Sequence, residues 1–150
     1  MMSELPEFPI DERFTAAVHN SARIWRLAID KRLKHLGIGQ SGWMTIAMVA
    51  KAREPLSQRA LADLVGVEGP SMVSMLDRLE REGLVERIAS PTDRRVKLVQ
   101  LTEAGRKVFA EVKQVGNEFR AFLLDGIDPQ ELAAATALLE SLRKRIEDSL

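Results

Sequence analysis

Residues 57–85 read SQRALADLVGVEGPSMVSMLDRLEREGLV, a stretch that predicts two short helices joined by a tight turn. The serine at its start is a preferred N-cap and predicts a first helix over residues 57–65. Residues 66–69 hold two glycines and predict a turn, and the proline that follows predicts a second helix over residues 70–82. The stretch therefore predicts a helix-turn-helix motif.

Residues 86–102 continue with ERIASPTDRRVKLVQLT, which predicts a β-hairpin. Residues 84–89 and 96–101 are β-prone runs, and they flank turn-forming and basic residues at 90–95. A hairpin with a basic tip directly after a helix-turn-helix is a wing. We therefore expect a winged helix-turn-helix over residues 56–101.

Long helices flank this central block. Apolar residues recur every three or four positions over residues 11–36 and over residues 103–150, with a break around Gly126 in the second region. Residues 43–52 predict a further, mostly buried helix. The length fits one domain over residues 1–150, mainly α-helical with a small β-hairpin wing.

The apolar faces of the two central helices are expected to pack against each other as a core. The predicted core residues are Leu61, Leu64 and Val65 in the first helix, and Val73, Leu76 and Leu79 in the second.

The opposite side of the second helix presents side chains suited to a DNA major groove. Ser71, Ser74, Met75 and Arg78 lie three, four and seven positions apart, so they share one face. Hydroxyl, thioether and guanidinium groups can all contact base edges, although an ion pair with Glu82 would occupy Arg78 equally well. The DNA-binding candidates of this helix are Pro70, Ser71, Ser74, Met75 and Arg78.

The hairpin concentrates positive charge. Arg94 and Arg95 lie at the tip, and Arg87 and Lys97 lie on the strands, so four cationic groups are expected to converge there. Guanidinium groups on a thin ribbon suit the negative potential of a narrow minor groove. Asp93 is expected to hold one neighbouring arginine by a charge-assisted hydrogen bond, which leaves the other arginine for DNA.

These residues resemble the multiple antibiotic resistance regulators (MarR), including the SlyA-like members of that family. The resemblance is most specific in LADLVGVEGPSMVSMLDRLEREGLVER, in DRR at the wing and in KLVQLTEAGR after it. It implies a triangular homodimer in which the helices of residues 11–36 and 103–150 form the interface. It also implies that residues 70–82 are the recognition helix and that Arg95 enters the minor groove. Ser74 stands where some relatives carry a larger base-reading side chain, so the operator sequence does not carry over.

The resemblance further implies a ligand cleft between the dimer interface and each winged head. Trp25, Trp43, Met44 and Met48 are candidates to line it, because aromatic and thioether groups suit a small aromatic or phenolic ligand. Core packing is the alternative role for these four side chains. The expected function is a sequence-specific regulator, a repressor that binds a pseudo-palindromic operator as a homodimer and is released by such a ligand.

Composition excludes several other classes of function. The chain has no cysteine, which removes thiolate metal ligands and thiol chemistry, and Lys plus Arg equals Asp plus Glu at 22 each. Because net charge is therefore uninformative, DNA binding depends on where the positive charge lies. No phosphate loop, HExxH motif, nucleophile elbow or tyrosine occurs, so we expect no enzyme, no cofactor and no metal.

Three further expectations concern location, partners and histidines. The first ten residues lack a signal peptide and no apolar run approaches the ~20 residues that span a membrane, so we expect a soluble cytoplasmic protein. His19 and His35 have no motif that suggests a metal site. The paired arginines of the wing argue against a winged helix that contacts proteins, which would not need them. A monomeric helical core could produce the same periodicities in the terminal helices, and this alternative stays open.

Overall fold

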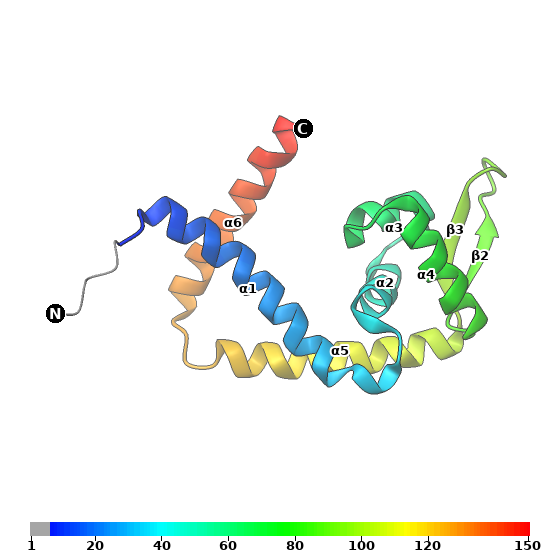
Figure 1. Cartoon of the computed structure of the whole chain (residues 1–150), viewed down its shortest axis with the longest axis horizontal. Helices are drawn as coiled ribbons and strands as arrows, with labels where there is room; N and C mark the ends of the chain where they lie inside the picture. The colour runs from blue at the N-terminus through cyan, green and yellow to red at the C-terminus, as the bar shows by residue number, and fades with distance from the viewer. Residues whose placement is uncertain (1–6) are drawn as a thin grey trace. The chain divides into compact units, whose positions relative to one another are not determined.

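The computed structural model describes residues 7–150, which fold into α-helices, a short 3-10 helix and a small antiparallel sheet (Figure 1). The helices are α1 (Ile10–Arg32), α2 (Gly39–Lys51), α3 (Gln58–Val65), α4 (Gly69–Arg81), α5 (Glu103–Leu124) and α6 (Pro129–Ser149), with a 3-10 helix η1 (Lys34–Leu36). The strands are β1 (Leu56–Ser57), β2 (Val85–Ala89) and β3 (Lys97–Leu101). The predicted fold class, mainly α-helical with a hairpin wing, is confirmed.

The first helix is shorter than the predicted 11–36, because its last turn tightens. After Arg32 the backbone changes to the 3-10 pattern of η1, in which the amide of Leu36 donates to the carbonyl of Leu33 at 3.0 Å. Gly37 then takes a left-handed conformation, with φ of 69°, that only glycine adopts without strain. This corner allows Leu33 and Ile38 to be buried on both sides of it.

The helix-turn-helix has the predicted order and local signals. The Ser57 hydroxyl caps α3 by accepting from the amide of Ala60 at 3.1 Å, and Gly66 ends that helix with φ of 80°. The predicted helix 57–65 is thereby confirmed within one residue, and the predicted helix 70–82 corresponds to α4.

The predicted core of these two helices is partly wrong. Leu61, Leu76 and Leu79 are fully buried, but Leu64 is 54% exposed and Val73 is 39% exposed. Met72 is fully buried and occupies the core position that Val73 was expected to take. Positions 72 and 73 both lie at helical spacing from Leu76, so periodicity alone does not distinguish them; the rotation of α4 against its neighbours does.

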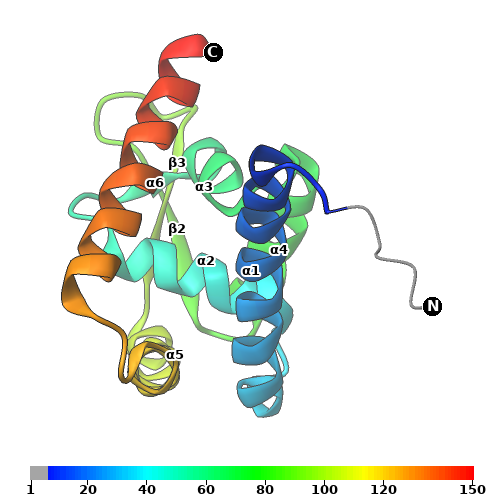
Figure 2. The same ribbon diagram turned by 90° about the vertical axis from the view of Figure 1, so that its left-hand side faces the viewer.

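The sheet has the order β1-β3-β2, with every neighbouring pair antiparallel. β2 and β3 form the predicted hairpin, and Val99 lies opposite both Arg87 in β2 and Leu56 in β1. β1 was not predicted, because a two-residue strand carries no alternation pattern. Helix α2 packs against β3, and Figure 2 shows it running across the strands.

Helix α5 begins in close contact with the turn that follows α4. The hydroxyl of Thr102 accepts from the amide of Gly105 at 3.1 Å and donates to the carbonyl of Gly83. A Cβ on Gly105 would lie only 2.0 Å from the carbonyl oxygen of Leu84. A glycine is therefore required where the helix approaches the turn backbone.

The chain divides into two compact units, one ending at Gly116 and one comprising residues 117–150. In the second unit Asp128 caps α6 by accepting from the amide of Gln130 at 2.9 Å. No residue of α6 is buried within the described part of the chain, although the helix carries Leu138, Leu139 and Ile146. A single chain thus leaves apolar side chains of this helix exposed to water.

Candidate nucleic-acid interface

The beginning of α4 is exposed on the side predicted to face DNA. Pro70, Ser71 and Ser74 are exposed there, together with Val73. The N-cap residue Glu68 makes no side-chain hydrogen bond to the first turn. The start of α4 thus presents two hydroxyls and a short apolar group to solvent, groups that can contact base edges or phosphates.

Further along α4, two predicted groove residues are not on the fully exposed face. Met75 is half-buried, and its Sδ lies 3.6 Å from the place that a Cβ on Gly42 would occupy. Arg78 is also half-buried: it donates from Nη2 to the carbonyl of Gly37 and from Nε to Glu82 at 3.4 Å. The alternative ion pair of Arg78 with Glu82 is therefore present, and the side chain also holds the corner after η1.

Arg87 lies in the middle of β2, and its side chain is directed to α4 and α3. Its guanidinium donates to Glu80 at 2.7 Å and to Asp77 at 2.6 Å, both on α4, and to Gln58 of α3 at 3.3 Å. Only 20% of the side chain is exposed. The hydrogen bond to Glu80 is the largest cause that raises the pKa of Arg87, burial opposes it, and Asp77 raises the pKa further.

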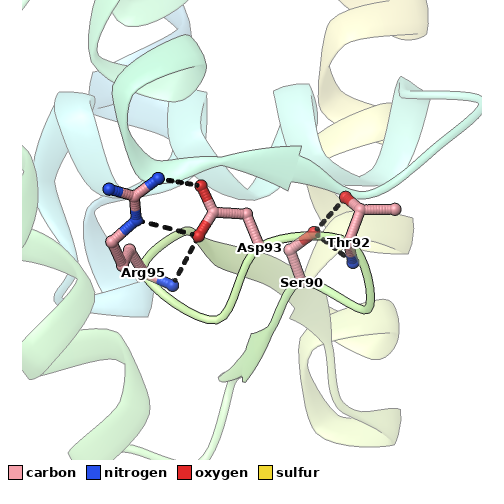
Figure 3. A network of polar contacts seen from close by, with 4 residues as sticks. All are labelled: Ser90, Thr92, Asp93 and Arg95. Atoms are coloured by element: carbon pink, nitrogen blue, oxygen red, sulfur yellow. Dashed lines mark hydrogen bonds and ion pairs between the residues drawn. The ribbon is translucent and has the colours of Figure 1, made fainter.

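The wing tip is ordered by its own side chains (Figure 3). Asp93 accepts from Nε and Nη2 of Arg95 at 3.1 and 3.2 Å, and from the Arg95 amide at 3.0 Å. Ser90 and Thr92 join their hydroxyls at 3.0 Å, and the amide of Thr92 donates to the Ser90 hydroxyl at 3.3 Å. The loop thus has a defined conformation although the side chain of Arg95 is 91% exposed.

The hydrogen bond from the Arg95 side chain, followed by that from its backbone amide, lowers the pKa of Asp93 below its ordinary value. Asp93 is therefore a carboxylate at neutral pH. The expectation that it holds one neighbouring arginine agrees with this geometry: it holds Arg95, while Arg94 is exposed beside it.

The expectation that four cationic groups converge at the tip is wrong for Arg87. Arg94, Arg95 and Lys97 are exposed on the wing. Arg87 is drawn to α4 because two carboxylates lie within hydrogen-bond distance of it. The exposed positive charge of the wing therefore comes from three residues near its end.

The four candidate ligand residues differ in their surroundings. Trp43 is buried and donates from Nε1 to Asp30 at 3.0 Å, whereas Met44 and Met48 are half-buried on the same helix and Trp25 of α1 is partly exposed. A hollow of about 530 Å³ is lined by none of these four residues. Its walls are the end of α2 and the segment after it, strands β2 and β3, and the start of α5. Its lining includes Arg53, Arg106 and Phe109.

The two histidines lie on different elements, His19 on α1 and His35 in η1. Nε2 of His35 lies 2.8 Å from the carboxylate of Glu111, within hydrogen-bond distance, and His19 is exposed. Among the described residues, no group of three or more metal-ligating side chains occurs. The described helices also include none that is both long and apolar enough to cross a membrane.

Sequence reasoning missed the partners of Arg87. Asp77 and Glu80 are three positions apart, so they share a face of α4, and this spacing was the available signal. Their pairing with β2 depends on how the hairpin packs against the helix.

Comparison with known proteins identifies the family. The MarR family model matches residues 48–97, which include α3, α4 and β2. The crystal structure of the transcriptional regulator PA3341 is 36% identical and superposes with a TM-score of 0.85, covering 90% of this chain and 98% of that chain.

Three less similar structures share the fold. MepR of S. aureus in complex with DNA is 23% identical, with a TM-score of 0.73 over 93% of this chain and 99% of that one. CouR from Rhodococcus jostii RHA1, bound to p-coumaroyl-CoA, is 24% identical, with a TM-score of 0.77 over 91% and 95%. SlyA is 18% identical, with a TM-score of 0.78 over 91% and 95%, so the likeness to SlyA concerns the fold. The family model, the whole-chain match to PA3341 and the winged helix-turn-helix agree, and the chain belongs to the MarR family of DNA-binding transcriptional regulators.

Proposed function

We propose that the chain is a repressor that binds a pseudo-palindromic operator as a homodimer, with the start of α4 in the major groove and Arg95 in the minor groove. The observation that carries the proposal is the tip of the wing. Arg95 is almost fully exposed, yet Asp93 fixes the direction of its guanidinium. A preorganised cation on a narrow hairpin loses little side-chain freedom when it enters a groove.

In this proposal Ser71 and Ser74 contact bases, and Pro70 opens a helix whose first amides face a phosphate. Arg94 and Lys97 contact phosphates beside the wing. The half-burial of Met75 and Arg78 favours a smaller part for them at the edge of the contact surface.

The dimer is proposed to form through residues 11–36 and 103–150 of one domain that spans residues 1–150. Each terminal region separately supports this. Helix α6 buries none of its residues within the described chain, and exposed apolar side chains also occur on α1, Ile10 and Ile24 among them. Packing of these faces against a second copy would remove them from water.

Two recognition helices in a dimer would enter successive major grooves about 10 bp apart. A bound dimer would exclude RNA polymerase from the promoter and so repress transcription. A small aromatic or phenolic ligand is proposed to release the dimer from DNA by binding near Trp25, Trp43, Met44 and Met48. It can do so only to the extent that it binds the DNA-free conformation more tightly than the DNA-bound conformation. The p-coumaroyl-CoA complex of CouR supports a ligand of this class.

The DNA proposal is tested by selection. The full chain is used to recover duplexes from a random pool of about 30 base pairs, a length that exceeds two half-sites one turn apart. The recovered sequences should be inverted repeats, and each duplex should bind two chains in sedimentation analysis. Recovery of single, unrepeated sites bound by one chain would contradict the homodimer, and recovery of no sequence would contradict operator binding.

The ligand proposal is tested with the selected duplex. Fluorescence anisotropy measures DNA affinity with hydroxycinnamate, salicylate, benzoate and p-coumaroyl-CoA. At least one of these compounds should weaken binding. A constant affinity across the panel would contradict release by this class of ligand. Met48→Ala should then shift the effective ligand concentration, with the exposed Lys51→Ala as the control.

A further inference from the structure

Arg87 connects three elements of the winged head through one side chain. It extends from the middle of β2 and donates to Asp77 and Glu80 of α4, at 2.6 and 2.7 Å, and to Gln58 at the start of α3, at 3.3 Å. All three donor nitrogens of the guanidinium have a partner. A planar fork with partners on each nitrogen has one orientation, and it constrains the elements to which those partners belong.

We propose that Arg87 is a positioning residue for DNA recognition: it fixes the wing against the recognition helix α4, and it does not contact DNA. The proposal rests on the proposed function, because it requires α4 and the wing to bind the same operator. It assigns to Asp77 and Glu80 the same positioning role from the side of α4.

The local charges support this role over a DNA contact. Two carboxylates lie against the guanidinium of Arg87, so its charge is already neutralised within the protein. With Arg81 in the same hollow, the site holds two acidic and two basic side chains and has no excess positive charge for a phosphate. The side chain of Arg87 is only 20% exposed, whereas that of Arg95 at the wing tip is 91% exposed. A phosphate contact by Arg87 would require its withdrawal from both carboxylates.

The position of Arg87 in the hairpin explains why fixing it matters. Arg87 pairs with Val99, and the strands continue past it to the pair Ala89 and Lys97 before the tip. We call the hydrogen bonds of Arg87 to Asp77 and Glu80 the clamp. The tip therefore lies about 15 Å beyond the clamp, given a rise of about 3.3 Å per residue. A pivot of about 10° at the clamp would move the tip by roughly 3 Å, which is enough to separate Arg95 from its groove while α4 stays in place.

A first experiment asks whether the substitution Asp77→Asn strengthens or weakens DNA binding. Asp77→Asn removes a negative charge from the head, so general electrostatics predicts tighter DNA binding. The clamp predicts weaker binding, by about fivefold to tenfold, because Arg87 loses one of its two anionic partners. Glu86→Gln is the matched control: it removes one carboxylate from the neighbouring position of β2, where the side chain contacts Gln100 and not α4. The control should bind as tightly as the unmodified chain or slightly tighter.

A second experiment is a double-mutant cycle on the duplex selected by the unmodified chain. Arg87→Gln alone should weaken binding by about tenfold, and it should change the dependence of log affinity on log salt no more than Arg95→Ala does, because both substitutions act through the wing contact. In an Arg95→Ala background the same substitution should cost less than about threefold, because only the phosphate contacts of Arg94 and Lys97 then remain for the wing to misplace. Arg87→Lys keeps the charge but cannot donate to both carboxylates as a fork, so it should restore only part of the affinity.

Several outcomes would overturn the proposal. Equal losses from Arg87→Gln in both backgrounds, a salt slope reduced by a further one or so in the Arg95→Ala background, or full affinity in Arg87→Lys would each show that Arg87 contacts DNA by its charge. Tighter binding by Asp77→Asn would overturn it as well. Thermal unfolding of each variant establishes that binding is measured on folded protein, and Asp77→Asn provides the test if Arg87→Gln does not fold. If the unmodified chain selects no duplex, the proposed function fails, whereas normal selection with unaffected variants means that only the clamp fails.

Discussion

The carboxylate of Asp93 accepts two hydrogen bonds from the guanidinium of Arg95, at 3.1 and 3.2 Å, two residues further along the wing. An exposed arginine samples many rotamers, and this contact selects one of them. The same carboxylate also accepts from the backbone amide of Arg95, so the loop and the side chain are ordered together. The wing therefore presents the guanidinium of Arg95 in a defined direction before DNA binds.

Removal of Arg95 should reduce the electrostatic part of DNA binding. In Arg95→Ala the affinity for the selected duplex should fall by about tenfold, and the magnitude of the log affinity against log salt slope should fall by up to about one. Anisotropy titrations at several salt concentrations measure both. Lys51→Ala, on the exposed end of α2, should change neither quantity; an unchanged slope in Arg95→Ala would place that arginine outside the DNA backbone contacts.

The pKa of Asp93 should lie below its ordinary value of 3.8 and should rise in Arg95→Ala. The folded chain favours the carboxylate, so the order of the tip is fully present above that ordinary value and is lost as the pH falls through the lowered pKa. The rise should be incomplete, because the backbone amide at position 95 still donates to the carboxylate. An NMR titration of the side-chain carboxyl measures the shift. Titration at or above 3.8 in the unmodified chain would contradict the geometry.

Met72 and Val73 should differ sharply in their contribution to stability. Met72→Ala should lower the free energy of unfolding by about 2–4 kcal/mol, because the side chain is fully buried and its removal leaves a cavity. Val73→Ala should cost less than about 1 kcal/mol, because the side chain is 39% exposed. Urea unfolding measures both values. A larger loss for Val73→Ala than for Met72→Ala would show that α4 buries position 73, as its sequence predicted.

Gly105 and Gly116 provide a matched pair within α5. Gly105→Ala should lower the free energy of unfolding by about 2–4 kcal/mol, because the new Cβ would lie 2.0 Å from the Leu84 carbonyl oxygen and one backbone segment must move. Gly116→Ala should raise it by about 0.5–1 kcal/mol, since nothing lies within 4 Å and alanine favours the helix. Thermal unfolding of the two variants gives the comparison. Equal effects would contradict the close approach of α5 to the turn.

Ser71 and Arg78 should affect DNA recognition in different ways. Ser71→Ala should change which bases are tolerated, because its exposed hydroxyl is placed to contact base edges. Arg78→Ala should weaken binding by a similar factor for all sequences, because Arg78 holds the Gly37 carbonyl and Glu82 within the protein. Repeating the duplex selection with each variant separates the two effects. A changed base preference in Arg78→Ala would assign that side chain to the DNA contacts.

Local chemistry made much of the head predictable. Ser57 as a cap, Gly66 in a left-handed conformation and the β-prone runs around residues 90–95 act over a few neighbouring residues, and each produced the expected element. The pairing of Asp93 with a neighbouring arginine was predictable for the same reason, because its partner is two residues away. The length of α1 and the presence of strand β1 were not predictable from the sequence, because η1 and β1 depend on packing against other elements.

The sequence by itself determined the order of the elements, their caps and turns, the charge of the wing tip and, through its motifs, the family. Only the tertiary structure decided which side of α4 is buried and what the basic side chains bind. Arg78 reaches a carbonyl 41 residues away, and Arg87 reaches partners 7, 10 and 29 residues away. Capping and periodicity act over about four residues, whereas a guanidinium pairs with whatever carboxylates and carbonyls the packed elements bring to it.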